Sequence, residues 1–111
     1  MKFGGGGGGN MKNLMKQANQ MKEKMEKLQA EAGEKTVEAT SGGGMVTVVA
    51  KAKGEVLSIK IEPDIVQDND IEMLQDLITA AVNEALNRGQ EIMKDEVAKA
   101  AGGMGIPPGL L

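Results

Sequence analysis

Cysteine, histidine, tryptophan and tyrosine are absent from this 111-residue chain, and Phe3 is its single aromatic residue. The lack of cysteine excludes disulfides, thiolate catalysis and cysteine-based metal sites. The lack of histidine removes the usual general base near neutral pH and the commonest transition-metal ligand. An enzyme would have to work with carboxylates and lysines, whose pKa values shift usefully only on burial. We therefore expect a protein that is not an enzyme and that holds no cofactor and no metal ion.

Long apolar runs are also lacking. No segment approaches the roughly 18 consecutive apolar residues that a membrane-spanning helix needs. The N-terminus has no charged-then-apolar signal pattern, because residues 1–3 lead directly into glycine. We therefore expect a cytoplasmic protein with no membrane partner.

The chain is short and contains 16 glycines, so it is expected to form one domain with a modest aliphatic core. Such a chain gains from a partner subunit, which favours an oligomer. The net charge is −3, but it is unevenly distributed. Residues 1–33 carry six lysines and three glutamates, whereas residues 34–111 carry seven basic and thirteen acidic groups. The first third of the chain is therefore its basic end.

Six consecutive glycines occupy residues 4–9, and we interpret residues 1–9 as a disordered glycine-rich tail. A phosphate-binding loop would need a preceding strand and a Gly-Lys-Ser/Thr ending, which this run lacks. Asn10 is a favourable N-cap for a helix predicted over about residues 11–32, with Gly33 at its C-terminal end.

An apolar stripe runs along the predicted first helix at alternating spacings of three and four residues, typical of a helix packed at a shallow angle against another. At about 33 Å this helix is longer than a small sheet can cover, so a partner subunit is expected to cover part of the stripe. Seven residues form it: Met11, Leu14, Ala18, Met21, Met25, Leu28 and Ala32.

Three strands are predicted next, over residues 35–41, 45–52 and 56–62. A glycine-rich turn at 41–44 and the Lys53–Gly54 hairpin signal make the connections short, so the strands should form an antiparallel meander with one apolar face. Pro63 should end the last strand because it cannot donate to the ladder.

Residues 64–70 are predicted to form an acidic loop. The spacing of Asp64, Asp68 and Asp70 does not match a calcium-binding EF-hand loop, so these carboxylates are better explained by the start of a helix. The last helix is predicted from about residue 70 to about 101. Its apolar face includes Leu77, Ile78 and Ala81, which with the first stripe form the predicted core or dimer seam. Residues 102–111 are rich in glycine and proline and are predicted to be a flexible tail.

Four ordered segments resemble the YbaB/EbfC family of nucleoid-associated proteins. They are GNMKNLMKQA at residues 9–18, EATSGGGMV at 38–46, EMLQDLI with AAVNEA across 72–85, and GIPPGL at 105–110. The resemblance covers residues 9–111, and only the long glycine run departs from it. It implies an α+β fold in which a three-stranded antiparallel meander lies between two long helices, an α-β-β-β-α protomer spanning residues 10–101. It also implies a tweezer-like homodimer in the bacterial cytoplasm that binds double-stranded DNA at the nucleoid.

The first helix carries the best candidates for phosphate contacts, since DNA affinity comes mainly from cations set against phosphates. Lys12 and Lys16 lie one turn apart opposite the apolar stripe, with no acidic residue before Glu23. Lys24 lacks a carboxylate at helical spacing. The alternative is that these lysines only keep the helix soluble, as most helical lysines do. The absence of stacking aromatics disfavours single-stranded nucleic acid.

Lys22 and Lys27 are weaker candidates because each has a glutamate four residues later, Glu26 and Glu31.

On the last helix, Arg88 is the better candidate because it precedes Gly89, where a ligand could approach the backbone closely. Lys94 and Lys99 are surrounded by acidic residues.

A second function remains open from the sequence. The chain could be a dimeric adaptor that docks replication or recombination proteins through its acidic half and its tail, with little direct DNA binding. Binding to duplex DNA that weakens steeply with salt would distinguish the first function from the second.

Overall fold

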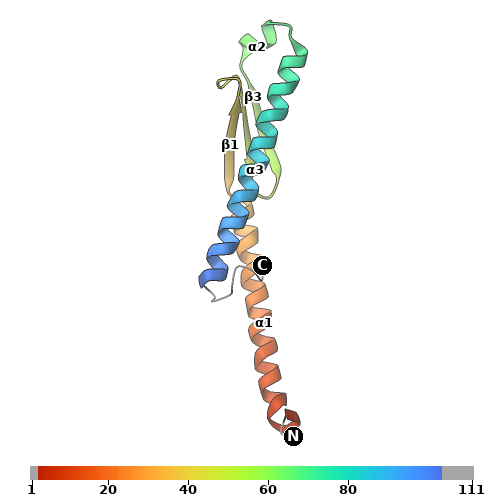
Figure 1. The fold of residues 1–111 in the computed structure, drawn as a ribbon, viewed down its shortest axis with the longest axis vertical. Coiled ribbons are helices and arrows are strands. Elements are labelled where there is room, and N and C mark those ends of the chain that lie inside the picture. The colour runs from red at the N-terminus through yellow and green to blue at the C-terminus, as the bar shows by residue number, and fades with distance from the viewer. Residues whose placement is uncertain (1–2, 104–111) are drawn as a thin grey trace.

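The computed structural model describes residues 3–103, and the element order is the predicted helix, three strands and long helix. Its elements are α1 (Phe3–Gly33), β1 (Thr36–Ser41), β2 (Val46–Lys51), β3 (Glu55–Ile61), α2 (Pro63–Gln67) and α3 (Ile71–Gly103). The α-β-β-β-α layout is therefore confirmed, with one short helix added between β3 and α3. The molecule is elongated, with extents of 79 × 21 × 20 Å (Figure 1).

Helix α1 is longer than the sequence predicted. It begins at Phe3 and includes the glycine run, whereas the prediction placed residues 1–9 in a tail and began the helix near residue 11. Each glycine costs about 1 kcal/mol relative to alanine within a helix, so these first turns are the least favourable part of α1. The C-terminal end agrees with the prediction, because α1 stops at Gly33. A Cβ at that position would lie 3.1 Å from the Lys53 Cβ of the β2–β3 hairpin.

The three strands form one antiparallel sheet in the order β1-β2-β3, as predicted. The β1–β2 turn needs its glycines, because Gly42, Gly43 and Gly44 have φ angles of 61°, 67° and 95°. A register shift between Val49 and Ala50 makes a bulge opposite β3.

The predicted acidic loop at 64–70 is partly wrong, because Pro63–Gln67 forms α2. Pro63 suits the first turn of a helix, where its missing N–H leaves no unmade bond, and Asp64 lies at the favourable N-terminal end. Ile65 holds this helix to the domain, since it is only 2% exposed. The chain then turns through Asn69, with φ 58°, into α3.

Helix α3 starts where the sequence predicted. The backbone N–H of Met73 donates to the Asp70 carboxylate at 3.0 Å, which makes Asp70 the N-cap. The helix ends at Gly103, two residues beyond the predicted end. The rest of the predicted tail, residues 104–111, lies outside the described residues.

The core lies between α3 and one face of the sheet, and it is made of small aliphatic side chains. Its fully buried members are Ala39, Val46, Val48, Ala50, Ala81 and Ala85. Alanines on both surfaces let the helix approach the sheet closely. At Gly89 the approach leaves no room for a side chain, because a Cβ there would lie 2.9 Å from the Ala52 Cα. The glycine that interrupts the apolar pattern is therefore a packing residue.

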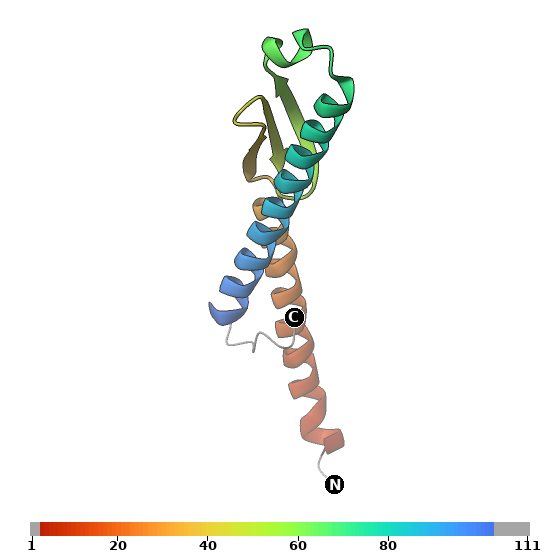
Figure 2. The ribbon, with the colours of Figure 1, turned by 45° about the horizontal axis from the view of Figure 1, so that its top comes forward.

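Strand β3 is the uncovered part of the sheet. Ile59 pairs with Val48, which lies buried under α3, so Ile59 points to the same face. Yet Leu57 is 46% and Ile59 44% exposed, because α3 lies over β1 and β2. Figure 2 shows α3 crossing the sheet and then running beside α1, which continues past the end of α3. The predicted apolar face exists, but a single chain covers only part of it.

Candidate nucleic-acid interface

Helix α1 carries five exposed lysines, which form a basic face. Helical spacing places Lys12, Lys16 and Lys27 on one side of α1, opposite the apolar stripe, with Lys22 and Lys24 flanking them. All five side chains are exposed. Because this part of α1 projects beyond the sheet (Figure 1), these lysines can be reached by a large ligand.

Few carboxylates neutralise these lysines. Lys22 lies 3.9 Å from Glu26, as its spacing predicted, but the pair is loose and exposed. The expected partner of Lys27, Glu31, makes no ion pair with it. Within residues 3–103, Lys12, Lys16, Lys24 and Lys27 form no ion pair. The helical spacing of Lys27 and Glu31 therefore does not produce the expected ion pair.

Arg88 differs from the α1 lysines, because its guanidinium already makes hydrogen bonds within the fold. Nη1 donates to the carbonyl oxygen of Glu38 at 2.6 Å, and Nη2 to the Glu84 carboxylate at 2.9 Å. The first bond ties α3 to β1, and the second joins two residues of α3. The sequence reason for choosing Arg88 also fails, since Ala52 of the same chain fills the space beside Gly89.

The apolar stripe of α1 divides into two halves. Towards the sheet, Ala32 is buried and Met25 and Leu28 are half-buried where α1 contacts α3. Towards the N-terminus the stripe is open: Met11 and Leu14 are each 63% exposed, Met21 is 38% exposed, and Ala18 is exposed.

The three residues predicted on α3 as core or dimer seam lie in the core. Ala81 is buried in the sheet core, and Leu77 and Ile78 pack against that same core. They face the strands, so they anchor α3 to the sheet.

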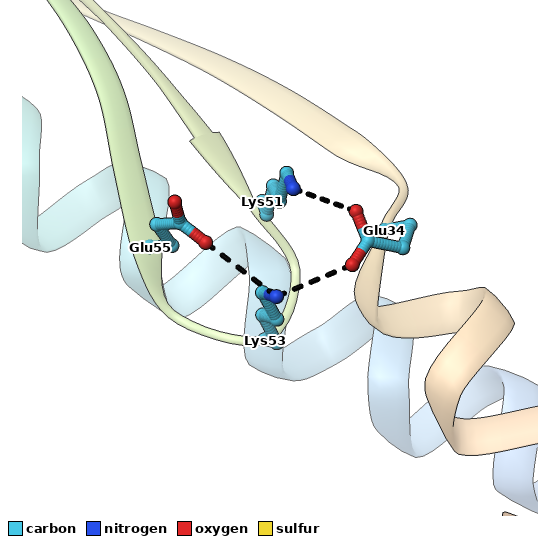
Figure 3. Close-up of polar contacts among 4 residues, drawn as sticks. All are labelled: Glu34, Lys51, Lys53 and Glu55. Carbon is cyan, nitrogen blue, oxygen red and sulfur yellow. Dashed lines mark hydrogen bonds and ion pairs between the residues drawn. The ribbon is translucent and has the colours of Figure 1, made fainter.

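An ionic cluster joins α1 to the β2–β3 hairpin (Figure 3). The Glu34 carboxylate bridges the Lys51 Nζ at 2.7 Å and the Lys53 Nζ at 3.2 Å, and Lys53 also meets Glu55 at 3.5 Å. The hydrogen bond from Lys51, followed by that from Lys53, lowers the pKa of Glu34, and Glu34 in turn raises the pKa of Lys53. The cluster links the C-terminal end of α1 to the hairpin.

A second ion pair braces α3 against the start of β1. Lys35 Nζ lies 2.7 Å from the Glu96 carboxylate, and its hydrogen bond lowers the pKa of Glu96. Sequence reasoning did not find the links between elements, because Glu34 lies 17 and 19 residues from Lys51 and Lys53, and Lys35 lies 61 residues from Glu96, outside any helical or strand period.

The described residues offer no group of three or more acidic side chains placed to hold a metal ion. No described helix is both long enough and apolar enough to cross a membrane. The arrangement is that of a small α+β protein whose cationic helix projects from a helix-covered meander.

Comparison with known proteins identifies the family to which this fold belongs. The model of the YbaB/EbfC DNA-binding family matches residues 7–104, and the chain belongs to this family. A nucleoid-associated protein of Acetivibrio thermocellus is 53% identical over 105 residues, covering 95% of this chain and 93% of the relative. One of Ruminiclostridium cellulolyticum is 50% identical over 107 residues, covering 96% and 93%.

A solved structure supports the fold. The crystal structure of an uncharacterized protein from Helicobacter pylori superimposes with a TM-score of 0.65 at 26% identity, covering 74% of this chain and 86% of that one.

Proposed function

We propose that this protein is a nucleoid-associated protein that binds double-stranded DNA as a homodimer and contacts phosphates through the lysines of α1. The observation that carries the proposal is a row of exposed lysines on a projecting helix, of which Lys12, Lys16, Lys24 and Lys27 form no ion pair within the described residues. Family membership and the names of the relatives support DNA as the ligand and the nucleoid as the location.

The homodimer is supported by the apolar surface that one chain leaves open. Leu57 and Ile59 of β3 lie beside the covered core and are exposed. The N-terminal half of the apolar stripe on α1 is exposed as well. Contiguous exposed apolar surface of this kind marks protein interfaces. A second copy placed against β3 would bury it and present two α1 helices to one duplex.

The phosphate contacts predict how affinity depends on salt. For B-DNA, the logarithm of the binding constant falls with the logarithm of salt concentration by about 0.9 per phosphate neutralised. If Lys12 and Lys16 of both subunits each contact one phosphate, the variant Lys12→Gln/Lys16→Gln loses four contacts. The magnitude of its salt slope should then fall by about 3 to 4. It should lose affinity for all duplex sequences alike, because phosphates carry no base information.

The test is fluorescence anisotropy with a labelled duplex across a salt series. Lys12→Gln is compared with Lys60→Gln, a matched control that removes the same charge from the exposed end of β3. The first variant should flatten the salt slope and the second should leave it unchanged. Equal slopes for both variants would remove Lys12 from the interface, and an unchanged slope for Lys12→Gln/Lys16→Gln would remove this part of α1. If the wild-type protein does not bind duplex DNA at low salt, the adaptor function replaces this one.

A further inference from the structure

The end of the molecule opposite the α1 lysines is strongly acidic. Between Lys60 and Arg88 the sequence contains no lysine or arginine. We call residues 62–76, which comprise α2, the following turn and the start of α3, the α2 cap. Its acidic residues are Glu62, Asp64, Asp68, Asp70, Glu72 and Asp76. No ion pair forms at any of them within the described chain. Such a surface repels DNA and attracts a cationic partner.

An apolar groove opens on the α2 cap among these carboxylates. Its volume is about 190 Å³, and it is lined by Ile65, Val66, Asn69, Asp70, Ile71 and Leu74. This is larger than the roughly 150 Å³ cavity that holds benzene in an engineered protein, so one aliphatic or thioether side chain fits. At its rim, Val66 is 54% and Ile71 66% exposed. An apolar group flanked by cations is the chemistry that suits the groove.

The N-terminal half of α1 offers this chemistry. Met11 and Met15 lie one helical turn apart and are each 63% exposed. Lys12 and Lys16 follow them directly in sequence. Met15 lies off the apolar stripe, between the stripe and the lysines, so packing through the stripe does not use it. A methionine side chain adapts readily to an irregular groove.

The two surfaces lie at opposite ends of the 79 Å long axis, as Figure 1 shows, so they cannot meet within one chain. We propose that Met15 of one molecule docks in the α2-cap groove of another and that Met11 packs on its apolar rim, with Lys12 and Lys16 paired to Asp64, Asp68 and Asp70. The contact joins two different surfaces, so it leaves a free surface at each end and can repeat along a row of molecules.

This contact uses the lysines that the proposed function assigns to phosphates, and in that respect it rests on the proposed function. Duplex DNA and the α2 cap then compete for α1. DNA should therefore disperse the assembly into dimer–DNA complexes.

Charge exchange between the two surfaces tests the contact. One variant carries Lys12→Asp/Lys16→Asp and the other Asp64→Lys/Asp68→Lys, all at exposed positions. Sedimentation velocity at low salt should show species larger than the dimer for the wild type and their loss at high salt. For each variant alone, the association constant should fall at least tenfold. An equimolar mixture of the two variants should restore the association constant. Failure of the mixture to associate, or undiminished association of either variant alone, would overturn the proposal.

Substitution of the groove tests the apolar half of the contact. Val66→Gln should weaken association about tenfold, whereas Met73→Gln should not. Met73 is also exposed, at 37%, but does not line the groove. Circular dichroism verifies that both variants fold. Equal effects of the two substitutions would show that the groove is not the docking site.

DNA binding separates this inference from the proposed function. Asp64→Lys/Asp68→Lys should abolish assembly and keep DNA binding, whereas Lys12→Asp/Lys16→Asp should lose both. If the mixture assembles although neither protein binds DNA, the docking contact stands and the proposed function falls. If the wild type remains a dimer at every salt and protein concentration, the groove does not serve a second copy, and the docking proposal is overturned.

Discussion

Gly89 illustrates how one residue sets the distance between α3 and the sheet. Replacing it with alanine gains about 1 kcal/mol of helix propensity but places a Cβ 2.9 Å from the Cα of Ala52, which is backbone and cannot move aside. Overpacking of this kind costs about 1–3 kcal/mol, so Gly89→Ala should lower the free energy of unfolding. Gly102→Ala is the control, because a Cβ at this position of the same helix lies in open space. It should not lower the free energy of unfolding. Urea unfolding measures both, and a Gly89→Ala variant as stable as wild type would contradict the packing role.

A second prediction concerns the side chain of Arg88. Its hydrogen bond to the Glu38 carbonyl is a link between α3 and β1, and a bond of this kind contributes about 0.5–1.5 kcal/mol. Arg88→Gln should therefore reduce stability to urea while leaving the salt dependence of DNA binding unchanged. A flatter salt slope with unchanged stability would instead make Arg88 a phosphate contact.

The Glu34 cluster acts at the scale of elements, because it joins α1 to the β2–β3 hairpin. Lys51 and Lys53 lower the pKa of Glu34 below its ordinary value of 4.5. A lowered pKa in the folded state contributes stability above the unfolded pKa, and this contribution is lost as pH falls through the folded value. Wild type should therefore exceed Glu34→Gln in thermal stability at pH 7, by a small margin since the group is exposed. The margin should shrink below pH 4.5 and vanish only below the lowered pKa of folded Glu34. A margin independent of pH would exclude the ionic contribution.

The sequence predicted those elements whose side chains repeat regularly. The three-and-four spacing of Met21, Met25 and Leu28 identified α1, and the β-branched run of Val46–Val49 identified the central strand. It missed α2, because Asp64 and Asp68 suit a loop as well as a five-residue helix. Among the site residues, the exposure of Lys12 and Lys16 follows from helical spacing alone. The placement of Arg88 does not, because its partner Glu38 lies 50 residues away.

Charge and apolar surface are both distributed along the whole molecule. The cationic arm of α1 lies at one end of the long axis and the acidic α2 cap at the other, with the open face of β3 beside the core between them. This distribution explains how a chain of net charge −3 can bind a polyanion, since the local field at α1 differs from the total.

The proposed dimer gives a prediction at this scale. Ile59→Asp places a charge on the uncovered face of β3 and should convert the dimer to a monomer, because a buried unpaired carboxylate is costly. Ser58→Asp, at the adjacent exposed position, is the control and should remain a dimer. Light scattering after size exclusion measures the mass. Dimers from both variants would place the subunit interface elsewhere.

The central claim is that α1 lysines bind the phosphates of duplex DNA, and one titration tests it most directly. Labelled duplex is titrated with the wild-type protein by fluorescence anisotropy at several salt concentrations. The account predicts binding at low salt that weakens linearly on a log–log plot, with a slope of about −3.6 for four contacts in the dimer. Binding that is independent of salt, or no binding even at low salt, would contradict it.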